Sequence, residues 1–359
     1  MLTTLTVGGA LAKRLVQDPP TGGTLLPSWI GWLFLGDVVL FLPILFVIGY
    51  TFGRVFPALA AVEDPLPAYE AVPLNDDDTP KDDNDPVHPG KPVTASIRAT
   101  HRLLRSVGGW LSYFRGFGYA VAINIMTIMI IVPFYHLLPI IPIRVVHLFA
   151  LYILTPWYVA WTHVVITPES NTSFLRRLVP FRRAFVATWF PTFLFWAATH
   201  VCLILPSLLA GAIGLDIELR NPLNLGPVVT NVDVGKSLCV IGVLVALQAL
   251  LLIPAHTALV RVQASLLPAD QDTIVPFDRS FGGLVAPEVV TGKGFASFTA
   301  ALTTVSRASW LRIYLLRLKV FATLVAMYVV LIATVVLQVY LFSVKCEYGK
   351  DRLNPLKCT

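Results

Sequence analysis

The sequence predicts an all-α integral membrane protein that crosses the bilayer six times. Of its 359 residues, 56% are hydrophobic and only 13% are charged, and the mean hydropathy is +0.72. Soluble domains carry about 25% charged residues, so this composition excludes an ordinary soluble domain. Six apolar runs each reach the length of about 20 residues that a helical span requires. They lie at 29–52, 117–138, 145–166, 185–208, 237–260 and 320–344.

Two polar segments flank the membrane domain, which we place at 29–345. Residues 1–28 form a lead that contains glycine and proline and is expected to be flexible. This lead lacks the apolar core and cleavage site of a secretory signal. Residues 346–359 form a polar tail, in which Cys346 and Cys358 are either bridged or free thiols. A bridge requires that the tail faces an oxidising space.

An acidic, proline-rich loop at 58–93 follows the first apolar run. It has six aspartates between Asp76 and Asp85. Such a composition cannot bury enough apolar surface to order itself, so we predict a disordered linker. Acidic runs also dock basic partners, and a protein partner bound through this loop is the alternative.

Three of the apolar runs contain a proline that is expected to kink the helix: Pro43, Pro156 and Pro254. Proline lacks the backbone N–H and clashes with the preceding turn. Arg261 follows Pro254 by seven residues, and His163 follows Pro156 by the same number. The spacing indicates that one helical unit recurs three times.

An amphipathic segment at 94–115 precedes the second run. Its apolar residues fall near one face of a helix, and its arginines are available to the other, which is typical of a helix that lies at the membrane interface. The apolar set is Ile97, Leu103, Leu104, Val107 and Leu111, and the basic set is Arg98, Arg102 and Arg105. Basic segments also precede the fourth and sixth runs.

This order of elements resembles the mitochondrial carrier family. Kinked odd spans, a surface helix in the following loop, and an even span entered through Arg115 and Gly116 are the shared features. The resemblance covers most of residues 30–345. It implies six spans arranged as three two-helix repeats about an axis along the membrane normal, with amphipathic surface helices on one side.

The resemblance also implies a gate that this chain has altered. In the family, each odd span carries an acid and a base after its proline, and the three pairs close one end of a cavity. The acid positions fall here on Leu45, Tyr158 and His256, and the base positions on Ile48, Trp161 and Leu259. None of the three pairs is present, so we expect Tyr158, Trp161 and His256 to seal this end by packing and single hydrogen bonds.

Polar residues inside the even spans are the candidates for a central cavity. They are Asn124, Thr199 and His200. Each can instead satisfy a backbone carbonyl of its own helix. No arginine was recognised at mid-depth, so a central ligand is expected to be weakly charged or apolar.

One carboxylate, Asp37, lies inside the first run, which begins with the interfacial anchors Trp29 and Trp32. Intramembrane carboxylates usually face a bundle interior and mark a functional site. Asp37 is only about two turns from the start of the run, where it can also reach interfacial water. The sequence leaves both interpretations open.

Three functions remain open at this point. The first is a degenerate carrier that serves as a membrane scaffold or insertion platform, and the missing gate charges favour it. The second is a solute transporter for a neutral or amphipathic small molecule. The third is an integral-membrane enzyme, although no catalytic set, metal-ligand spacing or cofactor motif is recognisable.

The expected partners are membrane lipid and a protein bound through the acidic loop, whereas no nucleic-acid motif is present. The resemblance implies a mitochondrial membrane, inner or outer, and an endomembrane is the alternative.

The distribution of basic residues predicts the topology. The loops after the first, third and fifth spans hold Arg98, Arg102, Arg105, Arg115, Arg176, Arg177, Arg182, Arg183, Arg279, Lys293, Arg307, Arg312, Arg317 and Lys319; those after the second and fourth hold Arg144, Arg220 and Lys236. By the positive-inside rule, the three basic loops share one side and both termini lie on the other.

An impermeant thiol reagent added to sealed vesicles should therefore distinguish the two sides. We expect it to label reduced Cys358 and a cysteine introduced as Asp82→Cys from opposite faces. Labelling of both from the same face would contradict this topology.

Overall fold

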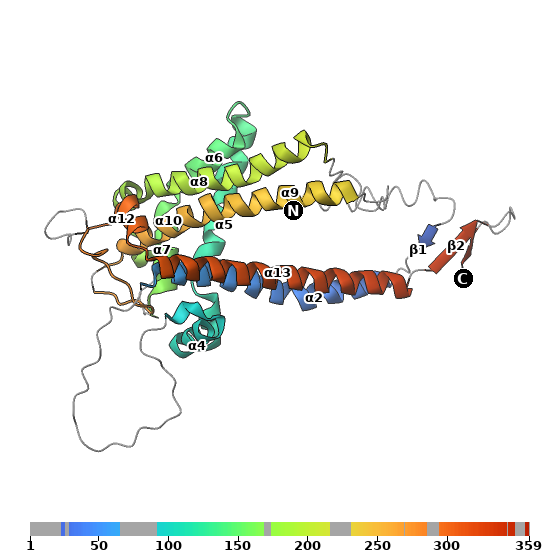
Figure 1. Ribbon diagram of the computed structural model, residues 1–359, viewed down its shortest axis with the longest axis horizontal. Coiled ribbons are helices and arrows are strands. Elements are labelled where there is room, and N and C mark those ends of the chain that lie inside the picture. Colours follow the sequence, from blue (N-terminus) through green and yellow to red (C-terminus); the bar gives the residue numbers. More distant parts are fainter. Residues whose placement is uncertain are drawn as a thin grey trace, which may run out of the picture. The chain divides into compact units, whose positions relative to one another are not determined.

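Helices dominate the computed structural model, which describes residues 23–25, 29–64, 92–168, 174–215, 231–268, 270–285, 294–342, 344–348 and 356–358 (Figure 1). Among these described residues, five helices are long and apolar enough to cross a membrane, or six if the bent pair Ile143–Ile153 and Thr155–Ile166 forms one span. This confirms the prediction of a helical membrane protein. The candidate spans are Ile30–Val62, Ile97–Leu137, Phe181–Ala212, Val234–Ser265, Arg307–Phe342 and the pair Ile143–Ile153 with Thr155–Ile166.

The three prolines lie where the helices change geometry. Pro43 is inside α2 (Ile30–Val47), which continues as the π-helix η1 (Ile48–Val55) and as α3 (Phe56–Val62). Pro156 lies in the first turn of α7 (Thr155–Ile166), which is bent by 60° from α6 (Ile143–Ile153). Pro254 opens α10 (Ile253–Ser265), after α9 (Asn231–Leu247) and the π-helix η5 (Gln248–Leu252). Proline is tolerated in a first turn, where its missing N–H leaves no orphaned partner.

The remaining helices are the even spans and the short connecting helices. α5 (Phe117–Leu137), α8 (Phe181–Ala212) and α13 (Arg307–Phe342) are the long ones. The short ones are α4 (Ile97–Gly108), α12 (Phe298–Thr303) and the 3₁₀ helices η2 (Val93–Ala95), η3 (Gly109–Phe114) and η4 (Phe174–Arg177).

Residues divide into two compact units, the first from 1–49 with 321–359 and the second from 50–320. In the first unit, α2 and the C-terminal part of α13 lie side by side (Figure 1). The rings of Trp29 and Phe342 meet edge-on with centroids 4.9 Å apart. Gln338 Nε2 donates a hydrogen bond of 3.1 Å to Asp37 Oδ1.

The first unit also contains a three-stranded antiparallel sheet that the sequence analysis did not predict. Its strands are β1 (Gly23–Leu25), β2 (Val344–Tyr348) and β3 (Leu356–Cys358), in the order β1-β2-β3. The register places Cys346 opposite Cys358. Directly opposed residues of an antiparallel pair lie within the Cα distance that a bridge needs, and both alternatives, bridged and free thiols, stay open.

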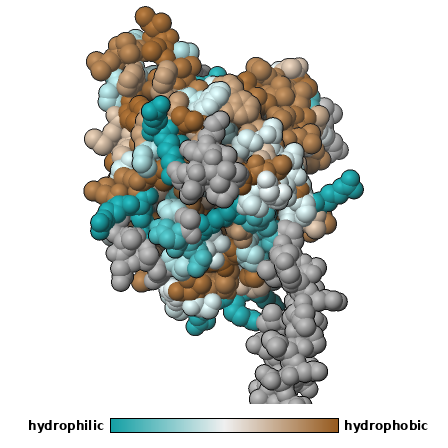
Figure 2. All heavy atoms as spheres, turned by 90° about the vertical axis from the view of Figure 1, so that its left-hand side faces the viewer, coloured by the Kyte–Doolittle hydropathy of each residue, from teal (hydrophilic) through white to brown (hydrophobic). Residues whose placement is uncertain are grey.

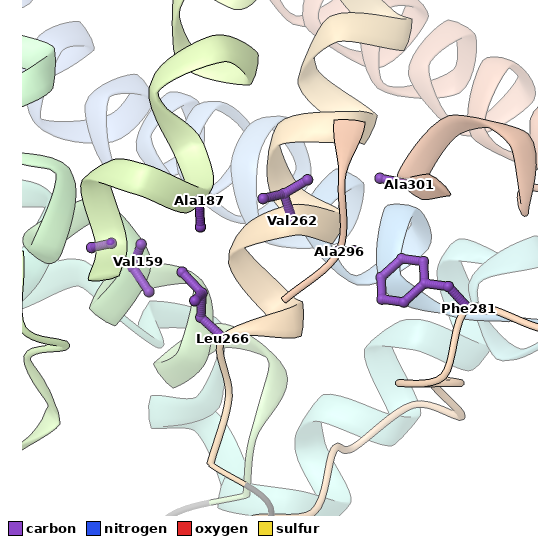
Figure 3. Close-up of a cluster of buried hydrophobic side chains, with 8 residues drawn as sticks. Val159, Ala187, Val262, Leu266, Phe281, Ala296 and Ala301 are labelled. Carbon is purple, nitrogen blue, oxygen red and sulfur yellow. The ribbon is translucent and has the colours of Figure 1, made fainter. Parts of the chain in front are cut away.

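The second unit is organised around α10, which packs against α3, α7, α8 and α12. Ten of its 13 residues are buried. Figure 3 shows Val262 of α10 and Leu266, which directly follows this helix, among Val159 of α7, Ala187 of α8 and apolar residues of the following segments. Small side chains at these contacts let the backbones approach closely, which is how helices associate within a bilayer.

Three expectations need correction in this unit. All seven residues of α3 are buried, and so is Glu63, so the loop predicted at 58–93 starts later; its residues 65–91 lie outside the described residues. The sixth span begins before residue 320, because α13 starts at Arg307. Leu111 is 80% exposed and does not continue the apolar face of α4. The reason is Gly109, whose φ of 61° ends that helix.

The surface helix is otherwise amphipathic as predicted. Leu104 of α4 is fully buried, whereas Arg98, Arg102 and Arg105 are exposed. The Arg105 guanidinium lies 5.6 Å from the ring centroid of Trp110, which is 71% exposed. Figure 2 shows one face of the molecule, where hydrophilic side chains cross the middle between apolar areas above and below.

Candidate functional site

Two ion pairs, one buried and one partly buried, meet where α3 ends. Glu63 lies 3.1 Å (Oε2) from Arg312 Nη1, and Asp64 lies 2.8 Å (Oδ1) from Arg261 Nη1. We call these four residues the ionic junction. Because α10 carries Arg261 and α13 carries Arg312, the junction ties the first, fifth and sixth candidate spans together.

Backbone groups complete the coordination of Glu63. Its carboxylate accepts hydrogen bonds from the N–H of Val93 at 2.6 Å and from the N–H of Thr94 at 3.0 Å. The Thr94 hydroxyl donates a further bond to Oε2. Arg312 in turn donates to the carbonyl of Glu63 and to that of Ala60. The junction therefore includes the chain that leads into the surface helix.

Arg261 is only 1% exposed, yet both of its Nη atoms donate hydrogen bonds to protein acceptors. It donates to the Ala61 carbonyl at 3.1 Å and to Thr304 Oγ1 at 3.2 Å. Its guanidinium lies 5.1 Å from the ring centroid of Phe281, which adds cation–π attraction. Buried charges persist only when they are paired and hydrogen-bonded in this way.

The loop that follows α10 is hydrogen-bonded to Asp64 of the ionic junction. The N–H of Asp278 donates to Asp64 Oδ2 at 3.1 Å, and the Asp64 N–H donates to the Pro276 carbonyl at 2.9 Å. Burial raises the pKa of Asp278, but hydrogen bonds from Ser280 and Gly282 and the charge of Arg261 outweigh it and hold this pKa below its ordinary value.

A second network joins α7 to the entrance of α5. Trp161 Nε1 donates to Tyr50 Oη at 3.1 Å, and the Tyr50 hydroxyl donates to the Arg115 carbonyl at 2.6 Å. The Arg115 side chain donates to the carbonyls of Val164 and Thr167 at the C-terminal end of α7. Cations are favourable at a helix C-terminus, where carbonyls have no intrahelical partner.

Gly116 is confined by this network. It has a φ of 70° and precedes the first residue of α5. A Cβ built on it would lie 2.9 Å from Trp161 Cδ1 and 3.4 Å from Val165 Cγ2. Arg115 and Gly116 thus lie between η3 and α5, at the position predicted to join the surface helix to the second span.

Arg54, His256 and Arg317 form a basic cluster within the candidate spans. Arg317 Nη2 lies 3.1 Å from His256 Nδ1, and the His256 ring lies 5.6 Å from that of Phe195. Arg54 of η1 is exposed and lies within electrostatic range of His256 and Tyr158. Within the part of the chain that the structure describes, neither Arg54 nor Arg317 forms an ion pair.

This cluster was not predicted, because Arg317 was assigned to the loop before the sixth span and Arg54 was given no role. Arg317 lies inside α13, since that helix begins ten residues earlier, at Arg307. The sequence between Arg307 and Val320 contains no helix breaker, and this was the available signal.

The three predicted cavity residues bond to their own helices. Asn124 Nδ2 donates to the Ala120 carbonyl at 2.7 Å, and Thr199 Oγ1 donates to the Phe195 carbonyl at 2.8 Å. His200 Nδ1 lies 2.8 Å from the Trp196 carbonyl. These contacts match the alternative that each satisfies a backbone carbonyl. Tyr158 is half-buried.

Within the described residues, no three His, Cys, Asp or Glu side chains lie together as metal ligands. No family model, curated protein or solved structure matches this chain. The resemblance to mitochondrial carriers therefore rests on the chain's own residues.

Proposed function

We propose that this protein is a carrier-like membrane protein with three two-helix repeats, and that it serves as a membrane scaffold or insertion platform. The order of kinked odd spans, surface helix and Arg115-Gly116 entrance supports the architecture. One observation carries the function, namely the ionic junction at the end of α3. Both of its carboxylates are buried or nearly so and are bonded to arginine and to backbone.

Transport by alternating access requires each closed end of a carrier to open. Opening at the junction would separate Glu63 from Arg312. Both side chains are buried, with exposed fractions of 1% and 5%. Separating a buried pair costs about 3–5 kcal/mol when it leaves one charge without compensation. Glu63 would also lose the N–H donors of Val93 and Thr94. A junction that costs this much to separate favours a scaffold over a transport cycle.

The surface of such a platform has two parts. The exposed arginines of α4 and the neighbouring Trp110 and Leu111 suit contact with anionic lipid head groups. The acidic loop supplies the second part, through which we propose that a protein partner binds. A mitochondrial membrane follows from the carrier resemblance, and fractionation with protease protection tests it against an endomembrane.

Reconstitution in liposomes tests scaffold against transporter. We expect no saturable flux of neutral, amphipathic or anionic solutes, either for the wild type or for Trp161→Ala. Trp161→Ala should still lower the free energy of unfolding, because it removes a half-buried ring whose Nε1 donates to Tyr50. Saturable flux that Trp161→Ala changes would overturn the scaffold proposal.

A second experiment tests the acidic loop as the binding site of a protein partner. The amount of partner protein that copurifies from native membranes should decrease when residues 65–91 are replaced by a glycine-serine linker of equal length.

The second candidate function is solute transport, and the basic cluster favours it. Cationic side chains within membrane spans are costly and often line the route of a ligand. With Arg54 and Arg317 lacking an acidic partner among the described residues, the solute would be an anion, not the neutral or amphipathic molecule expected from the sequence. Flux of a dicarboxylate or phosphate that is lost in Arg317→Gln would support this candidate. No observation among the described residues favours an enzyme.

A further inference from the structure

An apolar groove of about 660 Å³ lies between α2 and the C-terminal part of α13. Its walls include Phe34, Phe41, Leu42, Leu331 and Val335, and Asp37 is its one charged residue. Along α2 the groove runs from Phe34 to Phe46, which is about 18 Å at the rise of an α-helix. The volume is that of a small-molecule site.

Asp37, the charged residue of the groove, and its hydrogen-bond partner Gln338 each have one oxygen without a donor. Asp37 is 9% exposed, and only its Oδ1 has a partner, the Nε2 of Gln338 at 3.1 Å. Asp37 Oδ2 and Gln338 Oε1 are both buried without a hydrogen bond. Two side chains that are hydrogen-bonded to each other therefore each keep an oxygen acceptor without a donor, one of them on a carboxylate. Groups of this kind are normally paired when they are buried.

We propose that this groove binds a membrane lipid with a single apolar tail and a protonated primary amine as its head group, without a phosphate. An ammonium has three donors and no acceptor, so it can bond both Asp37 Oδ2 and Gln338 Oε1 and compensate the carboxylate charge. The tail occupies the apolar walls. This binding site is independent of the scaffold function.

The position of Asp37 suits this orientation. It is eight residues, or about 12 Å, from Trp29, which with Trp32 forms the interfacial end of α2. The head group therefore lies near the membrane interface, and the tail points from Asp37 toward Phe46 and the bilayer interior. A hydroxyl head group has one donor and no charge, and it leaves one acceptor unpaired. A phosphate head group is repelled by the carboxylate.

Photolabelling of the full-length protein tests the proposal. The protein is reconstituted in phosphatidylcholine nanodiscs, because the choline head group has no hydrogen-bond donor, and is labelled with a photoactivatable octadecylamine. We expect the label on α2 and on the C-terminal part of α13. Octadecylamine should displace it at a concentration at least tenfold below that of octadecanol, since a hydrogen bond to a charged group contributes about 1.5–3 kcal/mol.

Two variants with a matched control complete the design. Asp37→Asn should weaken labelling at least about tenfold. Val335→Trp fills the groove and should abolish labelling, whereas Val336→Trp changes a neighbour that is 60% exposed and should not. If Asp37→Asn fails to fold, the difference in labelling between Val335→Trp and Val336→Trp tests whether the label occupies the groove. Equal displacement by amine and alcohol, labelling outside these helices, cross-linking to a copurified protein helix, or equal labelling of Val335→Trp and Val336→Trp would each overturn the proposal.

Discussion

Replacing Arg312 with alanine should lower the free energy of unfolding by about 3–5 kcal/mol, because the buried Glu63 carboxylate then loses its cation. Glu63 is 2% exposed and cannot recover this loss by hydration. Arg312 also bonds the carbonyls of Glu63 and Ala60, which become unsatisfied. We expect a fall in the melting temperature of detergent-purified protein, measured by tryptophan fluorescence.

Arg307→Ala is the matched control, since Arg307 is an exposed arginine at the start of the same helix. Its effect should stay within about 0.5 kcal/mol. The double variant Arg312→Met with Glu63→Gln should recover part of the loss, because replacing both members of a buried pair by uncharged groups is often nearly neutral. Equal melting temperatures for Arg312→Ala and Arg307→Ala would contradict the proposed role of the ionic junction.

The helices of this protein were predictable, and the ionic junction was not. Apolar runs of span length are a local signal, and so are the prolines that begin α7 and α10. Arg261 and Asp64, in contrast, are 197 residues apart in sequence. A single sequence contains no signal that pairs charges over such a distance.

Local composition is a poor guide to the structure at Glu63 and Asp64. These residues were assigned to the acidic loop because aspartates and prolines follow closely. The structure instead continues the first span through α3, whose residues Phe56–Val62 are apolar and fully packed. The apolar pattern of 56–62 predicted continued helix, but the charge of the following segment was given more weight.

In the candidate site, too, local contacts were predictable from the sequence and long-range contacts were not. The roles of Asn124 and Thr199 in bonding their own helices follow from the i−4 spacing, which is local. The contact of Trp161 with Tyr50 joins residues 111 positions apart, and it appeared only in three dimensions. The sheet that contains β1 and β2 was missed for the same reason, since its strands lie near the two ends of the chain.

Gly116→Leu should destabilise the folded protein by about 2–5 kcal/mol. A side chain in the left-handed region costs about 1–2 kcal/mol, and the φ of Gly116 is 70°. Overpacking adds about 1–3 kcal/mol, because the new Cβ would lie 2.9 Å from Trp161 Cδ1. The indole cannot move freely, since its Nε1 donates to Tyr50. The measurement is again the melting temperature in detergent, together with the yield of membrane-inserted protein.

Gly36→Leu is the control that separates this effect from a general intolerance of large residues. Gly36 lies inside α2, and a Cβ there would meet no atom within 4 Å. Glycine weakens a helix interior by about 0.8–1.0 kcal/mol relative to alanine, so Gly36→Leu should be neutral or stabilising. Gly116→Ala should retain the conformational cost while reducing the overlap, and its loss should lie between the two. If Gly116→Leu and Gly36→Leu melt at the same temperature, then α5 does not depend on the close approach of Gly116 to Trp161.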